Sequence, residues 1–184
     1  MKSIGIVTDS HGGISQAEAD KLGIKILPMP LMIGQDSFLE GVSITRDAFF
    51  ERLNNGEKPA TSQPSPEQVM DIWREALKEY ETILHMPMSS GLSGSCNTAR
   101  MLSQEDEFEG KVFVVDNGRI STPMHRSILD AVELIEKGYD AEQIKDILES
   151  SKNEMSIYIA VETLEHLKNG GRISGYDSGR HEEP

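Results

Sequence analysis

A run of apolar residues that turns abruptly into glycines and serines constrains the fold of this chain more than any other stretch. Residues 83–88 form a short apolar run that is typical of a buried strand. Residues 89–95 are serines and glycines around one leucine, and helical spacing of apolar residues follows them. A strand, a turn and a helix start bring unpaired backbone N–H groups and hydroxyls together, where the helix dipole favours negative charge. We therefore expect residues 89–95 to hold an anionic group of a ligand.

The rest of the chain alternates between strand and helix patterns, which predicts an α/β fold: a parallel sheet with helices on both faces. In such a sheet ligands lie beyond the carboxyl ends of the strands, and Asp9, Ser10, Ser89, Ser90 and Asp116 are all expected to lie on that edge. The expected strands are 3–8, 24–33, 83–88, 111–115 and 156–161. Pro28 and Pro30 interrupt the second of these, so it is expected to be irregular or to lie at an edge. An exposed turn is expected over 34–41. The expected helices are 16–22, 46–54, one from Ser65 to about residue 80, one with helical spacing over 98–102, 122–137, one from Asp140, and a short one from Thr163 to Gly170.

Charge and composition exclude several classes of protein. Lys and Arg number 18 against 31 Asp and Glu, and the net charge of −13 disfavours nucleic acid and anionic membrane surfaces as partners. The single Cys96 excludes an internal disulfide, and the N-terminal segment up to Asp9 is too short and too soon charged for a signal peptide. No apolar run reaches membrane-spanning length. We expect a cytoplasmic protein.

Motifs of enzyme chemistry are weak. The segment 91–95 resembles a nucleophile elbow, but Ser95 stands where that motif needs glycine. Neither a Walker loop nor a dinucleotide-binding glycine motif is present, and the five histidines lack the spacing of metal ligands. We expect no catalytic residue, no metal and no cofactor.

The hydroxyl residues have two interpretations that the residues alone leave open. Segment 61–65 is a helix-capping turn in which Ser65 is the cap, and it leaves Thr61 and Ser62 available for a ligand. Ser93 and Ser95 are equally suited to cap the next helix or to bind a ligand. Arg172 either stabilises a helix end or presents its guanidinium to an anion.

Six motifs in order resemble the DegV family. They are Val7–Ser10, Glu40–Thr45, Thr61–Ser65, Ser89–Gly94, Val114–Asp116 and Leu167–Ser174. The resemblance implies a bacterial protein that binds a long-chain fatty acid and presents it to a separate fatty acid kinase, which phosphorylates the carboxyl group for phospholipid synthesis. It implies that Thr61 and Ser93 hydrogen-bond the fatty-acid carboxylate, with Ser62 and the Gly94 backbone close by. It also implies that Arg172 is part of a surface near the site that meets the kinase.

The resemblance also predicts a domain organisation. Residues 1–165 would form the N-terminal α/β domain of the family, residues 166–174 the start of a second α/β domain that is largely missing, and residues 175–184 a disordered tail. Homo-oligomers are compatible with this organisation. The alternative is a truncated, ligand-free remnant or an oligomerisation module.

Overall fold

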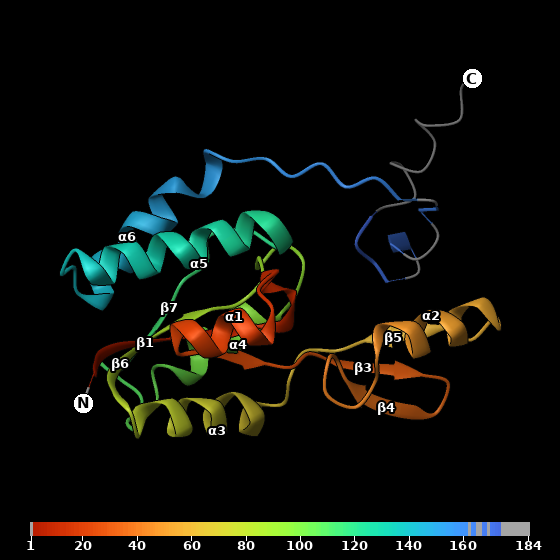
Figure 1. Ribbon diagram of the computed structural model, residues 1–184, viewed down its shortest axis with the longest axis horizontal. Helices are drawn as coiled ribbons and strands as arrows, with labels where there is room; N and C mark the ends of the chain where they lie inside the picture. Colours follow the sequence, from red (N-terminus) through yellow and green to blue (C-terminus); the bar gives the residue numbers. More distant parts are fainter. Residues whose placement is uncertain (1, 162, 165–166, 169, 174–184) are drawn as a thin grey trace.

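A four-stranded parallel sheet forms the centre of the computed structural model (Figure 1). Its strands, in spatial order, are β2 (Ile24–Leu27), β1 (Lys2–Asp9), β6 (Tyr80–Met86) and β7 (Val112–Val114). The structure describes residues 2–161, 163–164, 167–168 and 170–173. The parallel pairing confirms the predicted fold class.

Helices cover both faces of this sheet, and each face has its own apolar core (Figure 1). On one face lie α1 (Gln16–Leu22), α5 (Ser121–Glu136) and α6 (Ala141–Ser150). On the other lie α3 (Pro66–Leu77) and α4 (Ser95–Leu102). Apolar residues of the strands point alternately into the two cores, as the two faces of a pleated strand require.

The predicted starts of the helices are confirmed where a cap residue defined them. Ser65 and Gln68 form a reciprocal capping box at α3, and Asp140 and Gln143 do the same at α6. Helix α2 (Arg46–Asn54) begins after Thr45, whose hydroxyl accepts from the backbone N–H of Ala48. These caps act within one turn of chain, so they can be read from the sequence alone.

Segment 24–33 is interrupted at Pro28 and Pro30 as predicted, but its two halves belong to different sheets and not to one strand. The chain forms β2, leaves the parallel sheet, and starts β3 (Pro30–Ile33) in a separate antiparallel sheet with β4 (Asp36–Leu39) and β5 (Pro59–Thr61). Pro28 and Pro30 have no N–H to give to a sheet, and the N–H of Met29 between them donates to the Ser10 hydroxyl instead. The segment 34–41, expected as an exposed turn, includes strand β4, which pairs with β3 in a hairpin.

The strand predicted over 156–161 is absent. After α6 and the 3-10 turn Ser151–Asn153, residues 155–161, which we call the strap, run without regular structure and are exposed (Figure 1). The β-branched residues favour a strand, but no neighbouring strand pairs with them among the residues described. The tail 175–184 and parts of the helix expected after Thr163 lie outside the described residues.

Across the described ranges, none of the helices combines the length and the apolar character that crossing a membrane requires.

Candidate anion-binding site

The carboxyl ends of β1 and β6 place the serine-rich turn at one edge of the parallel sheet. Thr8 of β1 pairs with Met86 at the end of β6, so the segments that follow both strands emerge side by side. The turn 89–94 leads from that edge into α4. It closes on itself because the N–H groups of Leu92 and Ser93 both donate to the Ser89 carbonyl, at 3.0 and 3.2 Å.

The start of α4 has no side-chain cap on its N-cap residue, because this residue is Gly94. The Ser93 hydroxyl accepts from the N–H of Ser95 at 3.2 Å. An accepting hydroxyl keeps its own O–H to donate, so Ser93 can still bind an anion. The hydroxyl of Ser95 is buried and has no partner among the described residues. The local turn bond and a ligand role of Ser93 are therefore compatible.

Segment 61–63 leaves the small antiparallel sheet and lies against the start of α4. The Gln63 side-chain oxygen accepts from the Thr98 hydroxyl at 3.1 Å. A Cβ on Gly94 would stand 3.0 Å from that same oxygen, so the amide packs closely on the Gly94 backbone. Gln63 thus joins the segment that carries Thr61 and Ser62 to the turn that carries Ser93.

Arg172 approaches the site from the far end of the described chain. Its Nη2 donates to the Thr61 hydroxyl at 3.3 Å, and its Nη1 donates to the Gly170 carbonyl at 2.6 Å. Thr61 and Arg172 are exposed, so neither group is withdrawn from a ligand. A guanidinium offers five donors in a planar fork that suits a carboxylate.

The structure thus brings together most of the predicted site residues. Thr61 and Arg172 are in direct contact, Ser62 follows Thr61 with its backbone N–H on the Pro30 carbonyl, and Gly94 meets the same segment through Gln63. Within the described part of the chain no hydrogen bond joins Ser93 directly to Thr61. The site is an open cluster of hydroxyls, backbone N–H groups and one guanidinium.

Two aspartates that sequence reasoning placed at this edge, but did not count among the site residues, hold the segment after β6. Asp9 is buried, and its Oδ2 accepts from the Met88 N–H at 2.7 Å. Burial raises the pKa of the Asp9 carboxyl. The buried Asp116 accepts from the Ser90 hydroxyl at 2.6 Å and from Lys152 Nζ at 2.8 Å. Their position directly after parallel strands was the signal in the sequence.

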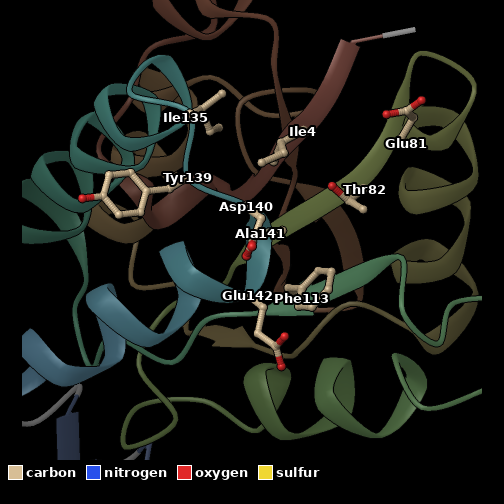
Figure 2. Close-up of a pocket in the computed structure, with 10 residues that line it drawn as sticks. Ile4, Glu81, Thr82, Phe113, Ile135, Tyr139, Asp140, Ala141 and Glu142 are labelled. Atoms are coloured by element: carbon tan, nitrogen blue, oxygen red, sulfur yellow. The ribbon is translucent and has the colours of Figure 1, made fainter.

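A hollow of about 440 Å³ lies elsewhere, near the amino ends of β1 and β6 (Figure 2). Ile4, Phe113 and Tyr139 contribute apolar surface, but Glu81, Asp140 and Glu142 also line it. Three acidic side chains repel an anion, so this hollow is unsuited to the ligand expected at the serine-rich turn. In the described ranges, no three His, Cys, Asp or Glu side chains are grouped so that they could hold a metal ion.

Fold and site together define a class: an α/β protein with an open cluster of hydroxyls, backbone N–H groups and one guanidinium at the carboxyl edge of a parallel sheet. The sequence model of the DegV family, described as "Uncharacterised protein, DegV family", matches residues 3–178 of this chain. The chain belongs to the DegV family.

Relatives agree with this assignment. A DegV domain-containing protein of Deinococcus radiodurans is 32% identical over 174 residues, which are 94% of this chain and 61% of that protein. A DegV family protein from Thermus thermophilus, whose structure describes fatty acid binding, superposes with a TM-score of 0.84 at 33% identity, over 98% of this chain and 64% of that one. DegV of Bacillus subtilis, described as a fatty acid binding protein, has a TM-score of 0.81 at 25% identity, over 97% and 64%. The chain therefore spans about three fifths of the length of these relatives.

Proposed function

We propose that this chain binds a long-chain fatty acid and holds its carboxylate at the turn 89–94. The hydroxyls of Thr61, Ser62 and Ser93, the backbone N–H of Gly94 and the guanidinium of Arg172 are the proposed donors. The proposal assigns no catalytic residue and no cofactor to the chain, which acts in the cytoplasm as a carrier.

The observation that carries the proposal is the contact between Arg172 and Thr61, two residues before Gln63, whose side chain packs on Gly94 at the uncapped start of α4. Thr61 accepts from the guanidinium, so its own O–H remains to donate to the carboxylate. The positive charge and the helix dipole both stabilise an anion there, although the chain as a whole is acidic. The fatty acid binding described for the Thermus and Bacillus relatives supports the same ligand.

The proposed partner is a separate fatty acid kinase that phosphorylates the bound carboxyl group. Thr61, Ser62, Gly94 and Arg172 are all exposed. A carboxylate held by these groups would therefore stay accessible to a second protein, as transfer of a phosphoryl group to it requires.

Mass spectrometry of lipid extracted from the purified protein tests the ligand. We expect a fatty acid near one equivalent in the parent and little in Thr61→Val/Ser93→Ala, which removes two of the proposed donors. Thr122→Val/Ser37→Ala is the matched control, because it makes the same chemical changes at exposed positions outside the site. Equal fatty acid in all three proteins would contradict the proposed site, and none in the parent would contradict the ligand.

The strap supports a second candidate function, that of an oligomerisation module. Tyr158 is 96% exposed and Ile159 63% exposed, in a segment of high strand propensity without a strand partner among the described residues. Such a segment suits pairing with another chain.

Sedimentation velocity over a range of concentrations tests self-association. We expect a dimer that Tyr158→Ser/Ile159→Ser converts to monomer. Val42→Ser/Met101→Ser removes comparable exposed apolar surface elsewhere and should leave the dimer intact. A parent that stays monomeric at all concentrations would exclude this function.

A further inference from the structure

The carboxylate of Asp116 accepts hydrogen bonds that hold the serine-rich turn in place. Its Oδ2 accepts from the Ser90 hydroxyl at 2.6 Å, and its Oδ1 accepts from the Ser90 backbone N–H at 3.3 Å. Oδ1 also accepts from the N–H of Gly118 at 3.3 Å, which fixes the carboxylate relative to its own loop. A carboxylate that binds both the hydroxyl and the N–H of one residue leaves that residue little freedom to rotate.

The proposed ligand donor Ser93 is attached to the same loop through Ser89, the residue before Ser90. The N–H of Ser89 donates to the Arg119 carbonyl at 2.9 Å, and the Ser89 carbonyl in turn accepts from the N–H of Ser93. Ser89 and Ser90 are therefore both attached to the loop 116–119, and Ser93 is attached to Ser89. The backbone position of Ser93 therefore depends on the segment 89–90, which the loop 116–119 holds.

The charge of Asp116 is balanced within the same cluster. Lys152 Nζ lies 2.8 Å from Oδ2, and its aliphatic stem packs against Gly118, where an added Cβ would stand 2.7 Å from it. Burial alone would raise the pKa of Asp116, but the hydrogen bonds from Lys152 and Ser90 outweigh it and lower the pKa to about 2. Asp116 is thus a carboxylate at neutral pH, and Lys152 offsets its repulsion of a nearby anion.

A second ion pair ties the same loop to α4. The backbone N–H of Asp116 donates to Glu149 Oε1 at 2.9 Å, and Glu149 accepts from Arg100 of α4 at 2.7 Å. The turn 89–94 lies between β6 and α4, so its first residues are fixed by Asp116 and the helix that follows it is fixed through Glu149. Both attachments lead to the loop after β7.

We propose that Asp116 is a positioning residue that holds the turn 89–94 in the conformation that binds a carboxylate. It does not touch the ligand and acts through Ser90. The inference rests on the proposed fatty-acid function and adds to it the source of head-group specificity: the acid is distinguished from an uncharged lipid of the same chain by a turn that Asp116 preorganises.

Paired ligands that differ only in the head group test the proposal. Dissociation constants are measured for oleic acid and for oleyl alcohol on the parent, Asp116→Asn, Ser90→Ala and the double variant. We expect each single variant to bind the acid about tenfold more weakly, the loss typical of one hydrogen bond to a charged group, with alcohol affinity unchanged. The double variant should be no weaker than either single variant, because both remove the same link.

Ile144→Val is the control for loss of stability alone, since it shortens a buried side chain of α6 that makes no hydrogen bond to the turn. Acid and alcohol affinities that fall together in Asp116→Asn, as in a protein that is merely destabilised, would overturn the positioning role. Losses in the two single variants that add in the double variant would overturn the link through Ser90.

Amide hydrogen exchange of residues 89–94, measured without ligand, tests the positioning role of Asp116 independently of fatty-acid binding. Exchange at Ser90 and Ser93 should be about tenfold faster in Asp116→Asn than in the parent. Unchanged exchange would overturn the inference even if oleic acid binds. Failure of the parent to bind oleic acid would overturn the proposed function, and with it the head-group specificity inferred for Asp116.

Discussion

His85 is a titratable side chain enclosed in the core between β6 and α3. Its Nδ1 accepts from the indole Nε1 of Trp73 at 3.1 Å, so the neutral ring carries its proton on Nε2. Burial lowers the pKa of His85 from 6.5 to about 3. The histidine therefore remains neutral in the folded protein over the physiological pH range and has a structural role. This agrees with the sequence, in which the five histidines lack the spacing of metal ligands.

This lowered pKa makes stability depend on pH in a defined direction. The unfolded chain takes up a proton on His85 below about pH 6.5 and the folded chain does not, so stability present above pH 6.5 is lost as the pH falls toward 3. From pH 6.5 to pH 5 the loss is about 2 kcal/mol. Urea unfolding at several pH values measures it. In His85→Gln, which keeps an acceptor for Trp73, this part of the decline should vanish, and an equal decline in both proteins would contradict the assignment.

Helix α3 shows how a local cap supports a distant core. The Ser65 hydroxyl accepts from the Gln68 N–H at 3.2 Å, and the Gln68 side chain accepts from the Ser65 N–H at 2.9 Å. Ser65→Ala should lower the free energy of unfolding by about 1 kcal/mol. Ser65→Asp keeps an acceptor at the same place and should change it little, so equal losses in denaturant unfolding of the two variants would contradict the capping role.

Local and non-local elements differ in how far the sequence predicts them. The cap residues Thr45, Ser65 and Asp140 marked their helices correctly because each bond spans only three residues. The interruption of 24–33 at Pro28 and Pro30 was predicted, but the division between two sheets was not, because pairing partners decide which sheet each half joins. The strand predicted over 156–161 is absent for the same reason, because strand propensity alone does not provide a neighbouring strand.

At the scale of the whole molecule, the site depends on contacts that no local pattern contains. Arg172 meets Thr61 across 111 residues of chain, and only the resemblance to the DegV family indicated that these residues act together. The edge of the parallel sheet was predictable, because the carboxyl ends of parallel strands coincide. The hydrogen bonds of Asp116 to Ser90 were not, since they require the register of β6 and β7 to be known.

The packing of Trp73 gives this protein an optical reporter of its own folding. It is the only tryptophan of the chain, it is fully enclosed, and its ring meets His85 and Phe108 edge-on. Indole emission shifts to longer wavelength when water reaches the ring, so fluorescence should be blue-shifted in the native protein and red-shifted on unfolding. Trp73 lies on α3 and contacts His85 of β6. Its fluorescence in one unlabelled sample should therefore report the disruption of the helix layer and of the central sheet as a single transition.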